Sequence, residues 1–257
     1  MYPNLFGIEG FSMVFMIIVG VIFAAALLFI YLHKKGLPSN SFLDLGIVII
    51  SAVLAGVIFA ILVENVYEAI KHSILGQPQE WTWGMTFFGG ILGGVPTFIL
   101  VYNLYYLRNN QPVMKYILII APACITLAHA LGRIGCFLSG CCYGIETDAA
   151  HGVLFPGMDH YVIPTQIFES IYLFCLSAAL VGFAFKYNFY YSFVIYAVFY
   201  GIFRFIIEFF RGDERGQLAG LSPSQYWCIL LILGAFPLYL LLKKINEKLD
   251  QGNTDEI

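Results

Sequence analysis

Charged residues are scarce in this sequence. Asp, Glu, Lys and Arg make up 11% of its 257 residues, whereas about a quarter of the residues in soluble globular domains are charged. Hydrophobic residues make up 60%, and the mean hydropathy is +0.82. This composition argues against a water-soluble enzyme and indicates an integral membrane protein.

The sequence also lacks basic runs, internal repeats and the cysteine pattern of a secreted protein. Its formal net charge is -3, and it has no cluster of Lys and Arg of the kind that binds nucleic-acid phosphates. We therefore expect no nucleic-acid partner. Most of the six Cys lie in or beside apolar runs, unlike those of a disulfide scaffold. Cys124, Cys175 and Cys228 are expected to be inert.

Long apolar runs are what the sequence does contain. Runs of about 20 residues are long enough to cross the ~30 Å hydrocarbon core of a bilayer. The fold class predicted from them is an all-α integral membrane protein with seven transmembrane helices, in one transmembrane domain over residues 1–257. The predicted spans are 11–32, 42–63, 84–103, 114–131, 165–186, 189–210 and 225–242, followed by a loosely ordered polar tail over 243–257.

The basic residues predict the orientation of these spans. Eight of the 13 Lys and Arg lie in one set of alternate connections, which the positive-inside rule assigns to the cytoplasm. They are Lys34, Lys35, Arg108, Lys115, Lys186, Lys243, Lys244 and Lys248. The N-terminus and the loops 64–83, 132–164 and 211–224 are then expected outside, with the C-terminus in the cytoplasm.

Four charged residues inside or beside apolar runs stand out: Arg133, Glu169, Arg204 and Glu208. A central Arg costs about 2.5–3.5 kcal/mol on insertion scales, so each such charge requires a partner or a function. Arg204 and Glu208 lie four apart on one helical face, and Arg211 follows one turn later. The polar stripe of Arg204, Glu208 and Arg211 has two interpretations. It is either an ion pair that fixes helix packing or, as the favoured interpretation, a site for a phosphate, which guanidinium groups bind bidentately.

His129 and Arg133 form a second pair at helical spacing. The imidazole therefore lies beside the guanidinium at the same depth in the membrane. Two interpretations stay open for His129. It is either a hydrogen-bonded packing residue or a general base that accepts a thiol or hydroxyl proton.

Three cysteines, Cys136, Cys141 and Cys142, lie at the outer end of the fourth span. Their spacing, C-x4-C-C, is not a standard zinc pattern, and adjacent cysteines rarely ligate one tetrahedral ion, so no metal site is predicted. Beside Arg133, a thiolate could act as a nucleophile or a redox group. Packing of the thiols against neighbouring glycines is the other interpretation.

Two further segments have two interpretations each. The segment from Met85 to Gly94 contains four glycines in six positions, which permits either close helix packing or a broken helix that lines a cavity. The turn from Arg211 to Gly216 is either a solvated loop or, through Arg211 and Arg215, the entrance for a lipid headgroup or an acceptor.

Several of these motifs occur together in the order found in a known family. The segments are Gly132-Arg133-Ile134-Gly135-Cys136-Phe137 up to Gly144, Pro164-Thr165-Gln166-Ile167-Phe168-Glu169, and Tyr200-Gly201-Ile202-Phe203-Arg204-Phe205-Ile206-Ile207-Glu208-Phe209-Phe210-Arg211, with Met85 to Gly94, Ala121-Pro122, Leu221-Ser222 and Gln225. From about residue 84 to 240 the sequence resembles the phosphatidylglycerol:prolipoprotein diacylglyceryl transferases. Seven spans with an outer N-terminus agree with that family.

The resemblance implies a multi-pass transferase of the bacterial plasma (inner) membrane, with its active site toward the outer face and no cofactor. Such an enzyme moves the diacylglyceryl group of phosphatidylglycerol onto the lipobox cysteine of a prolipoprotein and releases glycerol 1-phosphate. By position, Arg133 is expected near the headgroup, Arg204 as the second essential arginine and Glu208 as its orienting partner, with His129 and Cys136 as further catalytic candidates. Substrate contacts are expected from Phe88, Gly89, Gly90, Cys141, Gly144, Gln166, Glu169, Tyr200 and Arg211.

The sequence departs from the family pattern at four positions. Phe88 stands where the family has a histidine, Cys136 where it has an asparagine, Cys141 where an acidic residue is usual, and Ile163 where it has a second histidine. His129 could replace the missing base. These changes indicate a divergent member, and three alternatives stay open: a paralogue with another acceptor or a cysteine nucleophile, a lipid-binding protein without activity, and, less favoured, a transporter.

Overall fold

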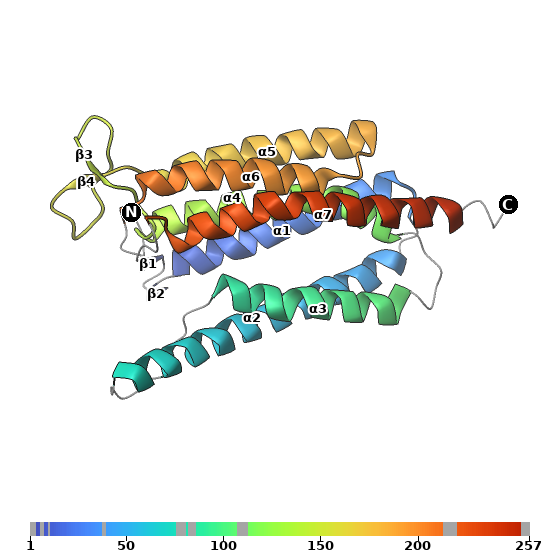
Figure 1. The fold of residues 1–257 in the computed structure, drawn as a ribbon, viewed down its shortest axis with the longest axis horizontal. Helices are drawn as coiled ribbons and strands as arrows, with labels where there is room; N and C mark the ends of the chain where they lie inside the picture. Colours follow the sequence, from blue (N-terminus) through green and yellow to red (C-terminus); the bar gives the residue numbers. More distant parts are fainter. Residues whose placement is uncertain are drawn as a thin grey trace. The chain divides into compact units, whose positions relative to one another are not determined.

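The computed structural model describes residues 4–5, 8–9, 11–37, 40–75, 81, 86–106, 113–212 and 220–252. These residues form two compact units, Met1–Leu32 with Met114–Ile257 (unit 1) and His33–Val113 (unit 2). The helices are α1 Phe11–Lys34, α2 Asn40–Leu75, α3 Phe87–Tyr106, α4 Val113–Leu138, α5 Thr165–Tyr187, α6 Ser192–Ile207 and α7 Pro223–Gly252 (Figure 1).

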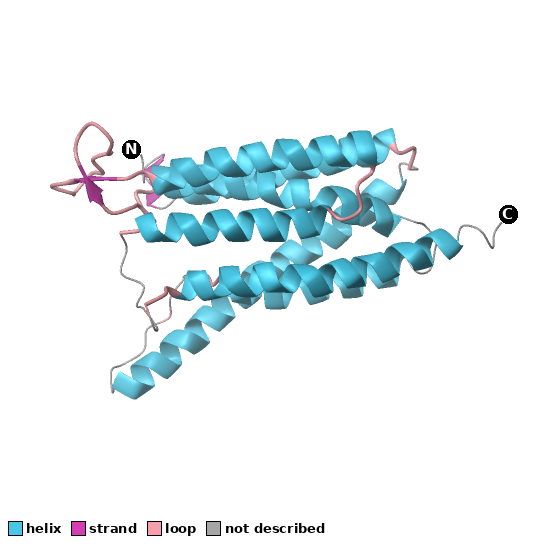
Figure 2. Ribbon diagram, turned by 45° about the horizontal axis from the view of Figure 1, so that its top comes forward, coloured by secondary structure: helices cyan, strands magenta, loops and turns pink. Residues whose placement is uncertain are grey.

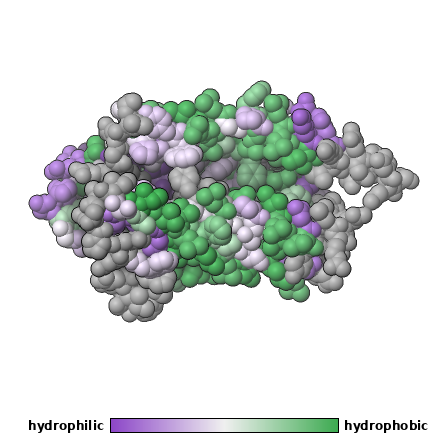
Figure 3. Space-filling view, turned by 60° about the horizontal axis from the view of Figure 1, so that its bottom comes forward, coloured by the Kyte–Doolittle hydropathy of each residue, from purple (hydrophilic) through white to green (hydrophobic). Residues whose placement is uncertain are grey.

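Six of these helices are long and apolar enough to cross a membrane. The stretches are Ser12–Lys34, Leu43–Ile70, Val113–Leu138, Thr165–Tyr187, Ser192–Phe210 and Pro223–Glu247, whereas the apolar stretch of α3, Leu92–Leu104, is shorter. Large apolar side chains such as Phe23, Leu43 and Leu233 are exposed, and hydrophobic residues, drawn in green, cover much of the middle of the face shown in Figure 3. The protein is therefore an α-helical integral membrane protein.

In unit 1, α1, α4, α5, α6 and α7 run lengthwise beside one another (Figures 1 and 2). Glycines allow two of these helix pairs to approach closely. A Cβ atom added at Gly20 of α1 would lie 2.9 Å from the carbonyl oxygen of Ala128 in α4. One added at Gly201 of α6 would lie 2.8 Å from the side chain of Ile232 in α7.

Serine hydroxyls on α5 attach it to α4. Ser170 Oγ donates to the Ala130 carbonyl and Ser177 Oγ to the Ala123 carbonyl, both at 2.9 Å and both buried. Each hydroxyl thereby satisfies a polar group that hydrocarbon could not. These bonds set the register between the two helices that carry Arg133 and Glu169.

Two pairs of short strands lie at one end of unit 1. β1 (Asn4–Leu5) pairs antiparallel with β2 (Ile8–Glu9), and β3 (Glu146–Thr147) with β4 (Tyr161–Val162). The β3–β4 hairpin lies in the connection between α4 and α5 (Figure 2). A bridge between Gly144 and Arg211 joins this connection to the chain that leaves α6.

In unit 2, α2 packs closely on α3 through the glycine-rich segment. A Cβ atom added at Gly89 would lie 2.5 Å from the Phe59 carbonyl oxygen, and one at Gly93 would lie 2.5 Å from that of Ala55. Of the two interpretations of this segment, close helix packing is therefore the one found. The expected substrate contacts of Phe88, Gly89 and Gly90, which belong to this unit, stay predictions.

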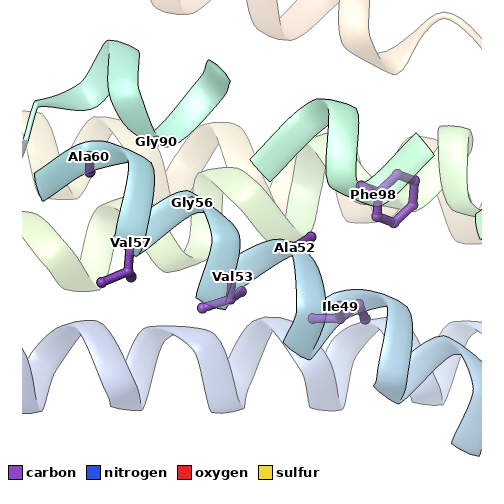
Figure 4. A pocket seen from close by; sticks show the side chains of 8 residues that line it. All are labelled: Ile49, Ala52, Val53, Gly56, Val57, Ala60, Gly90 and Phe98. Atoms are coloured by element: carbon purple, nitrogen blue, oxygen red, sulfur yellow. The ribbon is translucent and has the colours of Figure 1, made fainter. Parts of the chain in front are cut away.

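An apolar groove of about 380 Å³ runs along the same helix pair (Figure 4). It is lined by Ile49, Ala52, Val53, Gly56, Val57, Ala60, Gly90 and Phe98. A lining without charged or hydroxyl groups suits hydrocarbon chains and offers nothing for acid-base or phosphate chemistry. The groove is therefore not the reactive site.

Three helices extend beyond the predicted membrane spans. α2 continues to Leu75, α4 to Leu138 and α7 to Gly252, so residues 243–252 of the predicted polar tail are helical. The extensions of α2 and α7 contain several good helix formers and no proline, so these two helices continue beyond the apolar runs. Met85 and Arg215 lie outside the described residues.

Candidate active site

The carboxylate of Glu169, near the start of α5, lies at the centre of a buried ionic cluster. Its Oε2 is 3.0 Å from Arg133 Nε on α4 and 3.6 Å from Arg204 Nη1 on α6. Glu169 is 1% exposed, so its charge depends on these two partners. The family resemblance implied that Arg133 and Arg204 share one site, and in the structure both contact the same carboxylate; their role in a reaction stays a prediction.

The other oxygen of Glu169 faces the two aromatic rings predicted for the site. Tyr200 on α6 donates a hydrogen bond to Oε1 at 3.0 Å, and His129 Nε2 lies 3.9 Å from the same oxygen. The two rings meet edge to face with centroids 5.2 Å apart. The His129 side chain is 29% exposed, so part of its imidazole is accessible.

The predicted pair of Arg204 and Glu208 is also present, with Nη2 and Oε2 at 2.7 Å. The other carboxylate oxygen, Glu208 Oε1, accepts a hydrogen bond from Ser222 Oγ at 2.8 Å. Ser224 Oγ lies 3.5 Å from Arg204 Nη2. Arg204 is thus held by two carboxylates and the start of α7, which gives its guanidinium a fixed orientation.

Ser222 and Ser224 were missed as site residues, although the sequence contains a signal for Ser222. Ser222 and Gln225 form a capping box at the start of α7. The Gln225 backbone N–H donates to Ser222 Oγ at 3.3 Å, and the Ser222 N–H donates to Gln225 Oε1 at 2.9 Å. Pro223 occupies the first helical position, where it needs no N–H partner. The cap therefore fixes Ser222, whose hydroxyl proton is directed to Glu208.

The charges of the cluster balance, and one arginine is still able to bind an anion. Arg133 and Arg204 offset Glu169 and Glu208 when His129 is neutral. Arg133 contacts Glu169 through Nε. In the described part of the chain its two terminal nitrogens have no bonded acceptor, and the side chain is 14% exposed. These nitrogens form a fork that matches two phosphate oxygens.

The three cysteines converge one helical turn beyond Arg133. The Sγ atoms of Cys136, Cys141 and Cys142 all lie within 4.8 Å of one another, and none of the three forms a disulfide. Two residues of α5 hold the loop. Gln166 Nε2 donates to the Cys141 carbonyl at 2.6 Å, and Thr165 Oγ1 donates to that of Cys142 at 3.1 Å. The predicted site residue Gln166 therefore contacts the cysteine loop.

Arg211 contacts this cysteine cluster at Cys142. Hydrogen bonds from the thiols of Cys136 and Cys141, together with the charge and hydrogen bond of Arg211, lower the pKa of the Cys142 thiol. α6 gives way to a 3-10 turn at Glu208–Phe210. Because of this change, the predicted stripe does not continue straight from Glu208, and Arg211 lies at the thiols.

Gly144 allows the cysteine loop to pack on the end of α6. A Cβ atom there would lie 2.6 Å from the Phe210 carbonyl oxygen and 2.8 Å from Thr165 Cγ2. We therefore expect Gly144→Ala to lower the thermal unfolding midpoint in detergent by several degrees, as backbone overlap costs about 1–3 kcal/mol. Gly132→Ala is the matched control because a Cβ there meets nothing within 4 Å. Equal midpoints for the two variants would contradict this account.

Comparison with known proteins shows the family of this chain. Residues 4–241 match the family described as prolipoprotein diacylglyceryl transferase. The chain belongs to the prolipoprotein diacylglyceryl transferase family. It is 33% identical to phosphatidylglycerol--prolipoprotein diacylglyceryl transferase 2 of Clostridium perfringens over 95% of this chain and 96% of that protein. It is 35% identical to phosphatidylglycerol--prolipoprotein diacylglyceryl transferase of Clostridium tetani over 91% and 94%.

A more distant relative extends the comparison beyond the clostridia. Phosphatidylglycerol--prolipoprotein diacylglyceryl transferase of Dehalococcoides mccartyi is 30% identical over 79% of this chain and 78% of that protein. The predicted family membership is thus confirmed. The matched segment contains the ionic cluster, the cysteine loop and the capping box of α7.

Proposed function

We propose that this protein transfers the diacylglyceryl group of phosphatidylglycerol to the lipobox cysteine thiol of a prolipoprotein and releases glycerol 1-phosphate. One observation carries the proposal. In a chain that matches the transferase family over residues 4–241, two arginines from different helices meet at one buried carboxylate. The reaction requires a site that binds a phosphodiester and stabilises a phosphate leaving group, and guanidinium groups suit both tasks.

In this proposal the terminal nitrogens of Arg133 bind the phosphate of the donor lipid, and the guanidinium of Arg204, held by Glu169 and Glu208, adds a second positive charge to the site. As the thiolate attacks the glyceryl carbon, the C–O bond to phosphate breaks and negative charge grows on the leaving oxygen. Fixed cations in a low-dielectric site stabilise that charge without reorganisation. Glu169 and Glu208 are positioning residues, since they hold the two arginines and do not contact the reacting atoms.

The acceptor thiol must lose its proton, and we assign that role to His129. The family histidine is absent because Phe88 stands at its position. His129 lies 3.9 Å from Glu169 and keeps 29% exposure, so a substrate can reach it. A carboxylate beside an imidazole orients the ring and stabilises the imidazolium that forms.

The membrane arrangement belongs to the same proposal. α3 supplies the seventh span, the single transmembrane domain covers residues 1–257, and the N-terminus lies outside the bacterial plasma membrane. The ends of α4 and α6 and the starts of α5 and α7 contribute the cluster residues. These ends adjoin the loops 132–164 and 211–224, which are predicted outside. The site then faces the outer leaflet, where a lipid donor and an exported acceptor can meet.

A second candidate function is lipid binding without turnover, favoured by the replacement of the family base by Phe88. One assay separates the two. Purified protein is incubated with phosphatidylglycerol and a lipobox peptide, and both glycerol phosphate release and peptide mass are measured. A peptide whose cysteine is replaced by serine is the matched control.

We expect release of glycerol phosphate together with a cysteine peptide that is heavier by one diacylglyceryl group. Release without a modified peptide would indicate the same donor and another acceptor. If neither product forms while phosphatidylglycerol stays bound, the transferase proposal is wrong and the binding function replaces it.

A further inference from the structure

The cysteine cluster has no role in the proposed reaction, yet its geometry is that of a ligand set. Its three Sγ atoms lie within 4.8 Å of one another. Sulfur atoms around a tetrahedral zinc ion, at Zn–S distances of about 2.3 Å, lie about 3.8 Å apart. Small side-chain rotations would therefore bring all three thiols onto one ion.

Adjacent cysteines rarely ligate one tetrahedral ion, but the backbone conformation at Cys142 lets Cys141 and Cys142 do so. In an extended chain, Cys141 and Cys142 would point to opposite sides. Cys142 instead has a φ of 65°, in the left-handed region that side chains rarely adopt. The bonds from Thr165 and Gln166 to the two carbonyls hold this turn. A non-glycine residue kept in this conformation is a frequent mark of a functional loop.

The surrounding charges favour an anionic metal complex. A zinc ion with three thiolates has a net charge of about -1, and the cations at hand are Arg211 at Cys142 and Arg133 near Cys136. Thiolates are also the ligands that select zinc and copper(I) over harder cations. Arginine cannot lose its charge, so this compensation persists at any working pH.

The cluster also lies beside the residues assigned to phosphate and proton chemistry. His129, Arg133 and Cys136 are spaced i, i+4 and i+7 on α4, which places them along one helical face. On α5, Gln166 contacts the cysteine loop and Glu169, three residues later, contacts Arg133. The thiols and the ionic cluster are thus neighbours on the same two helices.

We propose that Cys136, Cys141 and Cys142 bind Zn²⁺ through three thiolates and that the acceptor thiol of the substrate takes the fourth coordination position. The inference rests on the proposed transferase function. Three protein ligands with one open position are typical of catalytic zinc sites. Because a metal-coordinated thiol is deprotonated, the ion would supply the thiolate that a divergent member without the family histidine requires.

The step balances without a further reagent. The acceptor S–H bond breaks as a Zn–S bond forms, and the proton passes through water to His129, two helical turns away on α4. The sulfur then uses a lone pair to attack the glyceryl carbon of phosphatidylglycerol. A C–S bond forms, the C–O bond to phosphate breaks, and the phosphate oxygen keeps the electron pair. The thioether product is a weak ligand and leaves the metal.

The first test measures metal binding and needs no turnover. Reduced, chelator-treated protein in detergent is titrated with Zn²⁺, and the bound metal is measured by mass spectrometry. We expect a single zinc ion per chain. Cys136→Ser and Cys142→Ser are each expected to weaken binding more than about 100-fold, because even outer-shell changes cost 10–100-fold. Cys175→Ser is the matched control, since Cys175 is an exposed cysteine of α5 outside the cluster.

The second test asks whether the fourth position accepts a thiol. Co²⁺ replaces Zn²⁺, and the thiolate-to-cobalt absorption is recorded before and after the lipobox peptide is added. We expect the absorption to increase with the cysteine peptide and to stay unchanged with the serine peptide. We also expect zinc removal to reduce diacylglyceryl transfer at least tenfold and zinc addition to restore it.

Three results would overturn the inference in distinguishable ways. Wild-type protein that binds no more zinc than Cys142→Ser has no such site. Zinc binding with an absorption that the cysteine peptide does not change removes the acceptor role. Full transfer by metal-free protein contradicts the inference while the proposed function stands. A different result, zinc and peptide binding without any transfer, would support the zinc site and contradict the proposed function.

Discussion

Replacing Arg204 by alanine is expected to reduce diacylglyceryl transfer at least 100- to 1,000-fold, the order of effect seen when one preorganised group at a developing oxyanion is removed. The guanidinium lies between Glu169 and Glu208, so its loss removes a cation from the leaving phosphate and leaves two buried carboxylates short of a partner. Initial rates over a range of phosphatidylglycerol concentrations measure the effect.

Two further variants separate chemistry from folding in this prediction. Arg133→Lys keeps the positive charge and removes the planar fork, so we expect transfer to fall at least tenfold while the protein stays folded. Lys186→Ala, which removes an exposed cation at the end of α5, should leave the rate unchanged. If Arg133→Lys and Arg204→Ala both transfer at the wild-type rate, the arginines do not stabilise the leaving group.

The sequence predicted the parts of the site that lie on one helix. Spacing alone placed Arg204 beside Glu208 and His129 beside Arg133, because residues four apart share a helical face. Nothing local indicates that Glu169 joins both pairs. Its contacts depend on how α5 packs against α4 and α6. The serine hydrogen bonds to α4 and the stacking of Tyr172 on Phe203 of α6 set that packing, and no single-helix pattern records it.

The membrane helices were predictable for a simple reason. Hydrocarbon forces each span to satisfy its own backbone and to expose apolar side chains, so length and hydropathy identify it. The extensions of α2 and α7 beyond the apolar runs were not predicted from hydropathy. Outside the hydrocarbon a polar sequence continues a helix as readily as an apolar one. The left-handed Cys142 was also unpredictable, since cysteine gives no sign of that conformation.

Glu169→Gln is expected to have the largest effect on stability. The side chain keeps its shape, but the buried negative charge that faces Arg133 and Arg204 is lost. Removing one partner of a buried pair costs about 3–5 kcal/mol, because the remaining charge is left uncompensated. We expect a clear drop in the thermal unfolding midpoint in detergent. Glu146→Gln, at an exposed carboxylate of β3, is the matched control and should change nothing.

The same variant distinguishes an anion site from a purely structural ion cluster. In an anion site the carboxylate of Glu169 competes with phosphate for the two guanidiniums. Without it, glycerol 1-phosphate should bind several-fold more tightly, raise the midpoint of Glu169→Gln more than that of wild type, and inhibit transfer at lower concentration. In a structural cluster, Glu169→Gln is destabilised to the same extent and gains no affinity for the product. Equal stabilisation of both proteins by glycerol 1-phosphate would exclude competition at Glu169 and place the phosphate elsewhere.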